Sequence, residues 1–114
     1  MPKGVKMNLI KERLMRQFNE IWQASIWVAN LLCSLQNCAD PDNNVDLSLE
    51  IGKFANEAAT FNWEFLCAEK LVYINKIYKV CTREISISEA ISYFTSVKRD
   101  LTEVLKKFLF YNLM

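Results

Sequence analysis

Three glutamates in the middle of the chain have a spacing at which carboxylates can act together. Glu50, Glu57 and Glu64 are seven residues apart, with Lys53 beside them, so they share one face if this segment is helical. Paired carboxylates on helices serve as general acid and base, or hold two metal ions. The di-metal pattern also needs Glu-x-x-His or equivalent ligands on facing helices, and the sequence contains no histidine. We therefore expect a solvated acidic stripe rather than a catalytic or metal site.

The four cysteines are the second group that could carry chemistry. They are Cys33, Cys38, Cys67 and Cys81, and no pair has the Cys-x-x-Cys spacing of a zinc or redox site. If the chain folds back near residues 40–44, Cys67 lies about 25 Å along the helix axis from Cys33. Disulfides need Cα atoms within about 7 Å, and zinc sites of four cysteines are tighter. Unless the second helix breaks, the sequence predicts free, mostly buried thiols, as is usual in a reducing compartment.

Other catalytic arrangements are missing from the sequence. Without histidine there is no Ser-His-Asp or Cys-His arrangement, and the two glycines form no phosphate-binding loop. Catalysis by a carboxylate, a lysine or a cysteine alone finds no support in the pattern. We therefore expect a protein that is not an enzyme and that takes no cofactor, no metal and no small-molecule substrate.

The 114-residue chain predicts an all-α fold. Its two glycines and two prolines are far fewer than the usual rates of about 7% and about 5%, and all-β or Rossmann-type folds need more. Helical periodicity covers about residues 7–37, residues 45–80, and the stretch from residue 85 to the C-terminus. Asp and Asn residues around Pro41 separate the first two segments, and a capping box formed by Ser86 and Glu89 opens the third.

These segments predict an antiparallel bundle of three long helices in a single domain of residues 1–114. The bundle has four helices if the second one breaks near residue 61, because residues 60–62 are mediocre helix formers. Hydrophobic residues make up 52% of the chain, which is more than three slender helices comfortably bury. We therefore expect a homo-oligomer, with a dimer favoured.

Trp27 is the sharpest candidate for a partner surface. On a helical wheel it is flanked by Ile26 and Leu31 but falls within a polar face. That face contains Arg16, Glu20, Gln23, Asn30, Ser34 and Asn37. An aromatic side chain there would be partly exposed, and aromatic residues are enriched at interface centres. The alternatives are a lone surface tryptophan, or one that the C-terminal tail covers.

The C-terminus is a second candidate surface. Residues 108–114 are apolar nearly all round and include Phe108, Phe110 and Tyr111. Chain ends are usually polar and frayed, so this one should pack against something. It covers either the chain's own bundle or a groove in a second copy or a partner protein.

Basic residues are predicted to gather at one end of the bundle. The start of the first helix would lie beside the end of a continuous second helix, with Tyr73 placed to stack on bases. The net charge is only +1, so the other interpretation is a solvated basic end that orients assembly. The candidate nucleic-acid contacts are Lys11, Arg13, Lys70, Tyr73, Lys76, Lys79 and Arg83.

The function that these patterns favour is contact with another macromolecule. Residues 21–39 carry no charge, but six of these nineteen residues are polar, so we expect no membrane association and a cytoplasmic location. The leading hypothesis is a non-catalytic helical-bundle interaction protein that oligomerises and presents an apolar, aromatic surface to a protein partner. The alternative is a nucleic-acid-associated accessory subunit that binds RNA or DNA through its basic end.

Overall fold

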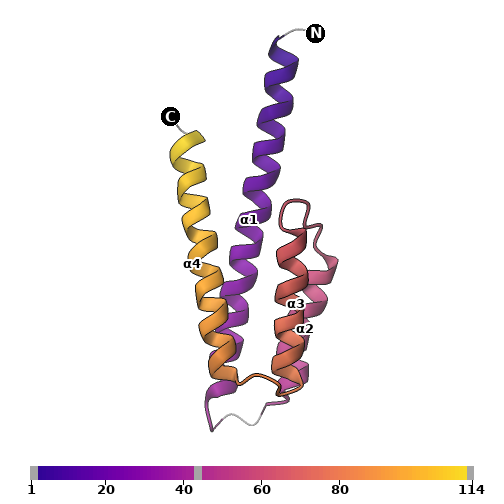
Figure 1. Ribbon diagram of the computed structural model, residues 1–114, viewed down its shortest axis with the longest axis vertical. Coiled ribbons are helices and arrows are strands. Elements are labelled where there is room, and N and C mark those ends of the chain that lie inside the picture. The colour runs from indigo at the N-terminus through magenta and orange to yellow at the C-terminus, as the bar shows by residue number, and fades with distance from the viewer. Residues whose placement is uncertain (1–2, 43–44, 113–114) are drawn as a thin grey trace.

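The computed structural model describes residues 3–42 and 45–112, with side chains described for residues 9–42 and 45–110. The described residues form four α-helices joined by turns and short loops (Figure 1). They are α1 (Lys3–Ala39), α2 (Leu47–Thr60), α3 (Cys67–Cys81) and α4 (Ile87–Asn112). The predicted all-α class is confirmed.

Two of the helix starts have caps of the kind that the sequence favours. The Asp46 side chain accepts a hydrogen bond from the backbone N–H of Leu49 and so caps the start of α2 at Leu47, six residues after Pro41. The Ser86 hydroxyl accepts the N–H of Glu89 at 3.0 Å, as the predicted capping box requires. These oxygens satisfy backbone donors that have no partner inside a helix.

The second predicted helix is not continuous. It ends at Thr60, and Phe61 has an extended backbone that turns the chain into a loop over residues 61–66. The loop is anchored because the Trp63 side chain is buried in the core. The continuous helix predicted over residues 45–80 is therefore wrong, and a hairpin of α2 and α3 takes its place, with the break at the position the sequence allowed.

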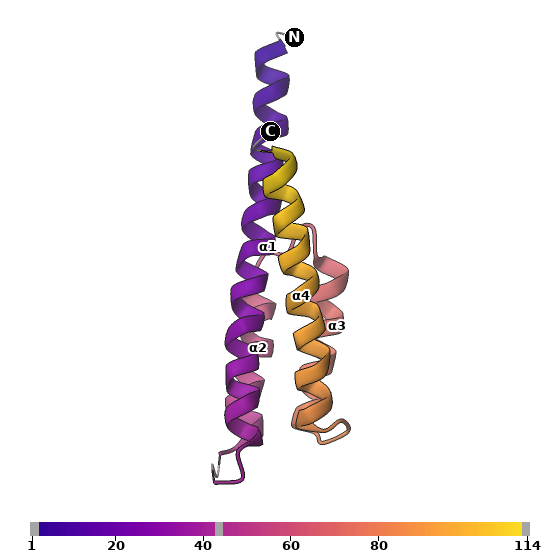
Figure 2. The same ribbon diagram turned by 90° about the vertical axis from the view of Figure 1, so that its left-hand side faces the viewer.

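The four helices are arranged so that each lies beside two others. α1 contacts α2 and α4, while α3 contacts α2 and α4, and consecutive helices run in opposite directions (Figure 1). At 1.5 Å per residue, α1 with its 37 residues is about 55 Å long, whereas α2 and α3 are about 21 and 22 Å long. Only the C-terminal part of α1 thus lies in a four-helix bundle. Its N-terminal part projects with α4 alone beside it, which explains the 61 Å length of the molecule (Figure 2).

Trp27 lies at the centre of this bundle. Its ring is within 5.8–6.3 Å, between centroids, of the rings of Trp63, Tyr73 and Phe94. Its indole Nε1–H donates to the carbonyl oxygen of Phe54 at 3.0 Å, so all four helices and the loop meet at one side chain. The side chain contributes both apolar area and a satisfied polar group to the core.

The partial exposure predicted for Trp27 is wrong. Only 3% of its surface is exposed, and the neighbouring Leu31 is fully buried. A helical wheel shows which residues of one helix share a face, but it does not show what packs against that face. In the structure the α2–α3 hairpin covers the edge of the polar face where Trp27 and Leu31 lie. Trp27 therefore has no surface to offer a partner in this conformation.

Candidate functional site

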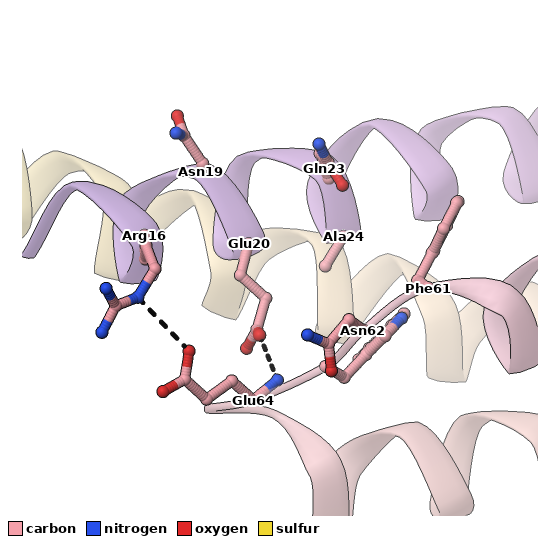
Figure 3. Close-up of a pocket in the computed structure, with 9 residues that line it drawn as sticks. Arg16, Asn19, Glu20, Gln23, Ala24, Phe61, Asn62 and Glu64 are labelled. Carbon is pink, nitrogen blue, oxygen red and sulfur yellow. Dashed lines mark hydrogen bonds and ion pairs between the residues drawn. The ribbon is translucent and has the colours of Figure 1, made fainter. Parts of the chain in front are cut away.

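A polar pocket of about 220 Å³ lies between α1 and the loop that joins α2 to α3 (Figure 3). Figure 3 shows the side chains of Arg16 and Glu20 directed toward the loop, and that of Asn19 directed away from it. Arg16 Nε and Glu64 Oε2 are 3.6 Å apart across this pocket, and both side chains are about half exposed. The lining residues are Arg16, Asn19, Glu20, Gln23, Ala24, Phe61, Asn62, Trp63 and Glu64.

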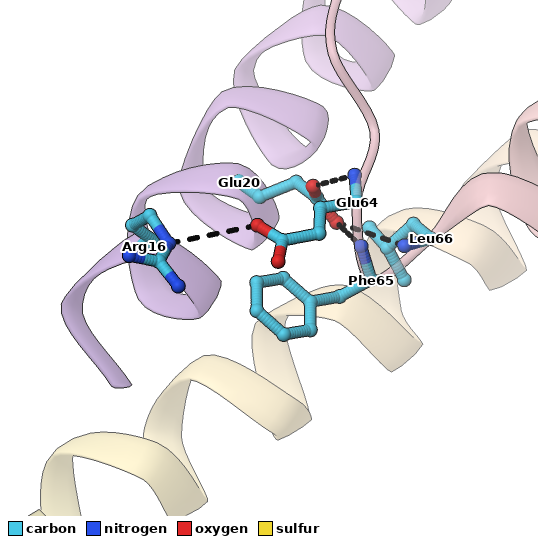
Figure 4. Close-up of polar contacts among 5 residues, drawn as sticks. All are labelled: Arg16, Glu20, Glu64, Phe65 and Leu66. Carbon is cyan, nitrogen blue, oxygen red and sulfur yellow. Dashed lines mark hydrogen bonds and ion pairs between the residues drawn. The ribbon is translucent and has the colours of Figure 1, made fainter. Parts of the chain in front are cut away.

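Glu20 joins α1 to the start of α3 (Figure 4). Its Oε1 accepts the backbone N–H of Glu64, and its Oε2 accepts those of Phe65 and Leu66, each at 2.8 Å. Leu66 is the N-cap of α3 and provides no side-chain cap of its own. Glu20 therefore supplies, from another helix, the acceptor that a helix start lacks.

This arrangement holds the α2–α3 loop against α1. Both carboxylate oxygens of Glu20 are engaged by backbone donors, and the Glu64 carboxylate pairs with Arg16. The Arg13 guanidinium lies 5.8 Å from the centre of the Phe65 ring and covers the same loop. Among the described residues, no group of three or more His, Cys, Asp or Glu side chains has a metal-binding arrangement.

The predicted acidic stripe is not on one helix face. Glu64 lies in the loop, Glu50 pairs with Lys53 at 3.7 Å on α2, and Glu57 is exposed one turn before the helix ends. The break after Thr60 causes this separation. The three carboxylates therefore do not form a shared site.

All four cysteines are free thiols, but two of them are exposed. Cys33 and Cys67 are exposed, so the prediction of mostly buried thiols is wrong for this pair. Burial raises the pKa of Cys38, with a smaller contribution from the Glu50 charge. Burial also raises the pKa of Cys81, with contributions from Asp46 and Cys38, and this places the two partly buried thiols in the same region.

The predicted basic end does not exist, because the hairpin reverses α3. The C-terminal turn of α3, which contains Lys79, lies at the opposite end of the molecule from the start of α1, and Arg83 follows it in the α3–α4 connection (Figure 1). Lys11 and Arg13 are thereby separated from both of them.

The residues predicted between those two groups are engaged within the fold. Tyr73 is buried in the core and does not form a stacking platform for bases. Lys70 Nζ lies 3.5 and 3.4 Å from the carbonyl oxygens of Ala59 and Phe61. Lys76 Nζ lies 4.9 Å from the centre of the Tyr93 ring.

An exposed apolar face runs along α1. Met15, Trp22 and Ile26 are 65%, 51% and 48% exposed, and Cys33 is exposed seven residues further on. Their steps of seven, four and seven residues give an average period of 3.5–3.6, so they form one stripe, which we name the α1 seam. A shallow hollow beside it is lined by Trp22, Ser25, Ile26, Ala29 and, from α4, Lys98.

The sequence contained the signal for the α1 seam. The stepping of Met15, Trp22 and Ile26 is visible in the sequence, but the more continuous core stripe of the same helix obscured it. Of the residues predicted for an interface, Ile26 belongs to the α1 seam. Phe108 packs against Phe18 with ring centroids 5.5 Å apart, and Phe110 is exposed near the end of α4. The side chain of Tyr111 lies outside the described residues.

Comparison with known proteins found no match, so the function is inferred from the geometry of the structure. No protein-family model matches the chain, and no curated protein and no solved structure is similar to it. Within the part of the chain that the structure describes, none of the helices combines the length and the apolar character that a bilayer-spanning segment requires.

Proposed function

We propose that this protein is a non-catalytic helical-bundle interaction protein that oligomerises and binds a protein partner through the α1 seam. The observation that carries the proposal is the exposure of Met15, Trp22 and Ile26 at helical spacing on one face. Scattered single apolar residues are normal on a protein surface, but an ordered stripe around a tryptophan is typical of an interface.

The chemistry of the α1 seam favours a protein helix or sheet over a nucleic acid. The seam is apolar, and the polar residues beside it include the uncharged Asn19 and Ser25, with Lys98 of α4 as a single cation in the hollow. Fully burying a large apolar side chain stabilises by about 1.5–3 kcal/mol, and about half of each of these surfaces is still exposed. The three residues together therefore offer roughly 3 kcal/mol, which is a contact of moderate strength after the costs of association.

Site-specific photo-crosslinking in the cells that make the protein tests this proposal. A photoreactive phenylalanine derivative replaces Trp22 in one variant and Leu49 in a control, since Leu49 is 70% exposed on α2. We expect discrete cross-linked protein products from position 22 only. Adding Ile26→Ser to the position-22 variant should remove these products, since Ile26 lies one turn further along the same stripe.

Two results would contradict the proposal. One is the absence of any product at position 22 in a folded protein. The other is the same set of products from positions 22 and 49, because non-specific collisions would then explain both. Mass spectrometry of the product distinguishes a second copy of this chain from a different protein.

A further inference from the structure

An apolar groove of about 490 Å³ opens between α3 and α4. Its floor contains Tyr73, Val97 and Leu101, which are buried, and its sides contain the half-exposed Val72 and Val104. On α4 the groove extends from Tyr93 to Val104, which is about 17 Å at 1.5 Å per residue. The groove is therefore about three helical turns long.

Both edges of this groove are acidic. Glu69 on α3 and Asp100 on α4 line it and are exposed, and Asp100 Oδ1 also lies 4.0 Å from Arg99 Nε at the surface. The pKa of Tyr73 between them is raised to about 12, mainly by burial, with smaller contributions from Tyr93, Glu69 and Asp100. Lys76 Nζ lies over the ring of Tyr93, which lines the groove at the start of α4.

The start of α1 projects beyond the rest of the fold. Phe18 contacts Phe108 across the antiparallel pair, so Asn112 at the end of α4 lies level with about residue 14 of α1. The preceding turns, residues 3–13, extend past α4, as Figure 2 shows. This projecting segment is about 16 Å long. A helical stretch of this length is marginal in water unless it packs against something.

The projecting segment has the chemistry that the groove lacks. Ile10 is 53% exposed and, at 100° per residue, lies in line with the core residue Val28 further along α1. At 100° per residue, Lys11 lies about 100° from Ile10 in one direction and Arg13 about 60° in the other. Both cations are exposed, although Arg13 also lies over the Phe65 ring of its own copy and must leave it to face a second copy. An apolar anchor between two cations is thus complementary to an apolar floor between two carboxylates.

We propose that the projecting segment of each copy docks in the α3–α4 groove of a second copy, so that two reciprocal contacts close a dimer. Ile10 lies on the groove floor, and Lys11 and Arg13 face Glu69 and Asp100 of the other copy. The segment and the groove are of about the same length, roughly three helical turns, which allows this fit. The inference rests on the oligomerisation in the proposed function and names its contact surfaces.

A charge exchange between two variants tests the dimer. One variant carries Lys11→Glu and Arg13→Glu, and the other carries Glu69→Lys and Asp100→Lys. Sedimentation velocity should give wild-type protein at twice 13.3 kDa. For each variant alone, the dissociation constant of the dimer should be at least about 100-fold larger than for wild type, because like charges face one another in both contacts. Their equimolar mixture should recover the dimer, since each segment then meets a groove of opposite charge.

Controls separate the contact from general effects. The variant Glu57→Lys/Glu84→Lys reverses two exposed charges elsewhere and should keep the wild-type mass. Ile10→Ser removes the apolar anchor without changing charge and should weaken the dimer. Circular dichroism checks that every variant keeps its helices, and the mixing step gives a gain that misfolding cannot produce.

The inference is overturned by a wild-type monomer at all concentrations, by reversed variants that keep the wild-type mass, or by a mixture that stays monomeric. A ladder of species that grows with concentration also overturns it, because open chains rather than closed pairs would form. These failures leave the cross-linking result at position 22 unaffected. Conversely, recovery of the dimer in the mixture stands even if position 22 gives no product.

Discussion

Glu20→Gln is the substitution that best tests how the α2–α3 loop is held. The Glu20 carboxylate accepts three backbone N–H groups, one at Oε1 and two at Oε2. Glutamine has nearly the same shape but only one acceptor oxygen. If that oxygen keeps the N–H groups of Phe65 and Leu66, the amide NH₂ faces the N–H of Glu64, and two donors then oppose each other.

The size of the effect follows from these contacts. A hydrogen bond to a charged group contributes about 1.5–3 kcal/mol, but the Glu64 bond is exposed and water replaces part of it. The two retained bonds lose the charge of their acceptor and with it part of their strength. We expect the free energy of unfolding to fall by about 1–2 kcal/mol. For a domain of this size that is roughly 4–10 °C in melting temperature.

Urea unfolding and amide hydrogen exchange measure this effect. The control is Glu57→Gln, which neutralises an exposed carboxylate on α2 and should change stability by less than about 0.5 kcal/mol. The amides of residues 64–66 should exchange faster in Glu20→Gln than in the control, whereas those in the middle of α4 should not. Equal unfolding midpoints and equal exchange in the two variants would refute the role assigned to Glu20.

Three further predictions concern the core and the thiols. Trp27→Phe should lower the free energy of unfolding, measured in urea titrations, by about 1–3 kcal/mol, because it removes the hydrogen bond to the Phe54 carbonyl and part of the core volume. The control Trp22→Phe, at an exposed site, should change the free energy of unfolding by less than about 0.5 kcal/mol. A chromogenic disulfide reagent should modify Cys33 and Cys67 before Cys38 and Cys81 in native protein, and equal rates for all four would contradict the burial of the second pair. The pKa of Tyr73 in the folded protein is about 12, against 10.0 for an ordinary tyrosine. Its contribution to the free energy of unfolding is therefore complete below pH 10 and is lost as the pH rises toward 12. Unfolding titrations at pH 9, 10 and 11 should show that loss in wild type, and Tyr73→Phe should reduce it.

The helix starts and the all-α class follow from local chemistry, which is why the sequence predicts them. The Ser86 hydroxyl and the Glu89 amide are three residues apart, and the bond between them forms wherever the chain starts a helix there. The scarcity of glycine and proline acts through backbone conformation at each residue. Neither effect depends on what the helix later packs against.

The break near residue 61 depends on contacts from far along the chain. Glu20 is 44–46 residues from the three amides it accepts, and the Trp63 ring contacts that of Trp27, which is also far away along the chain. Residues 60–62 lack glycine and proline, so their local preference is only weakly against a helix. The same long-range packing explains Trp27, since the hairpin that buries it exists only because the second helix breaks.

The break also decides where the apolar surface remains. A continuous helix over residues 45–80 would have matched the length of α1 and covered its N-terminal part. The hairpin instead places α2 and α3 around the C-terminal part of α1, where they complete a closed core around Trp27. Two short helices cannot cover a helix more than twice their length. Ile10 and Met15 are therefore left exposed, so the fold that closes the core around Trp27 also leaves apolar surface on the N-terminal part of α1.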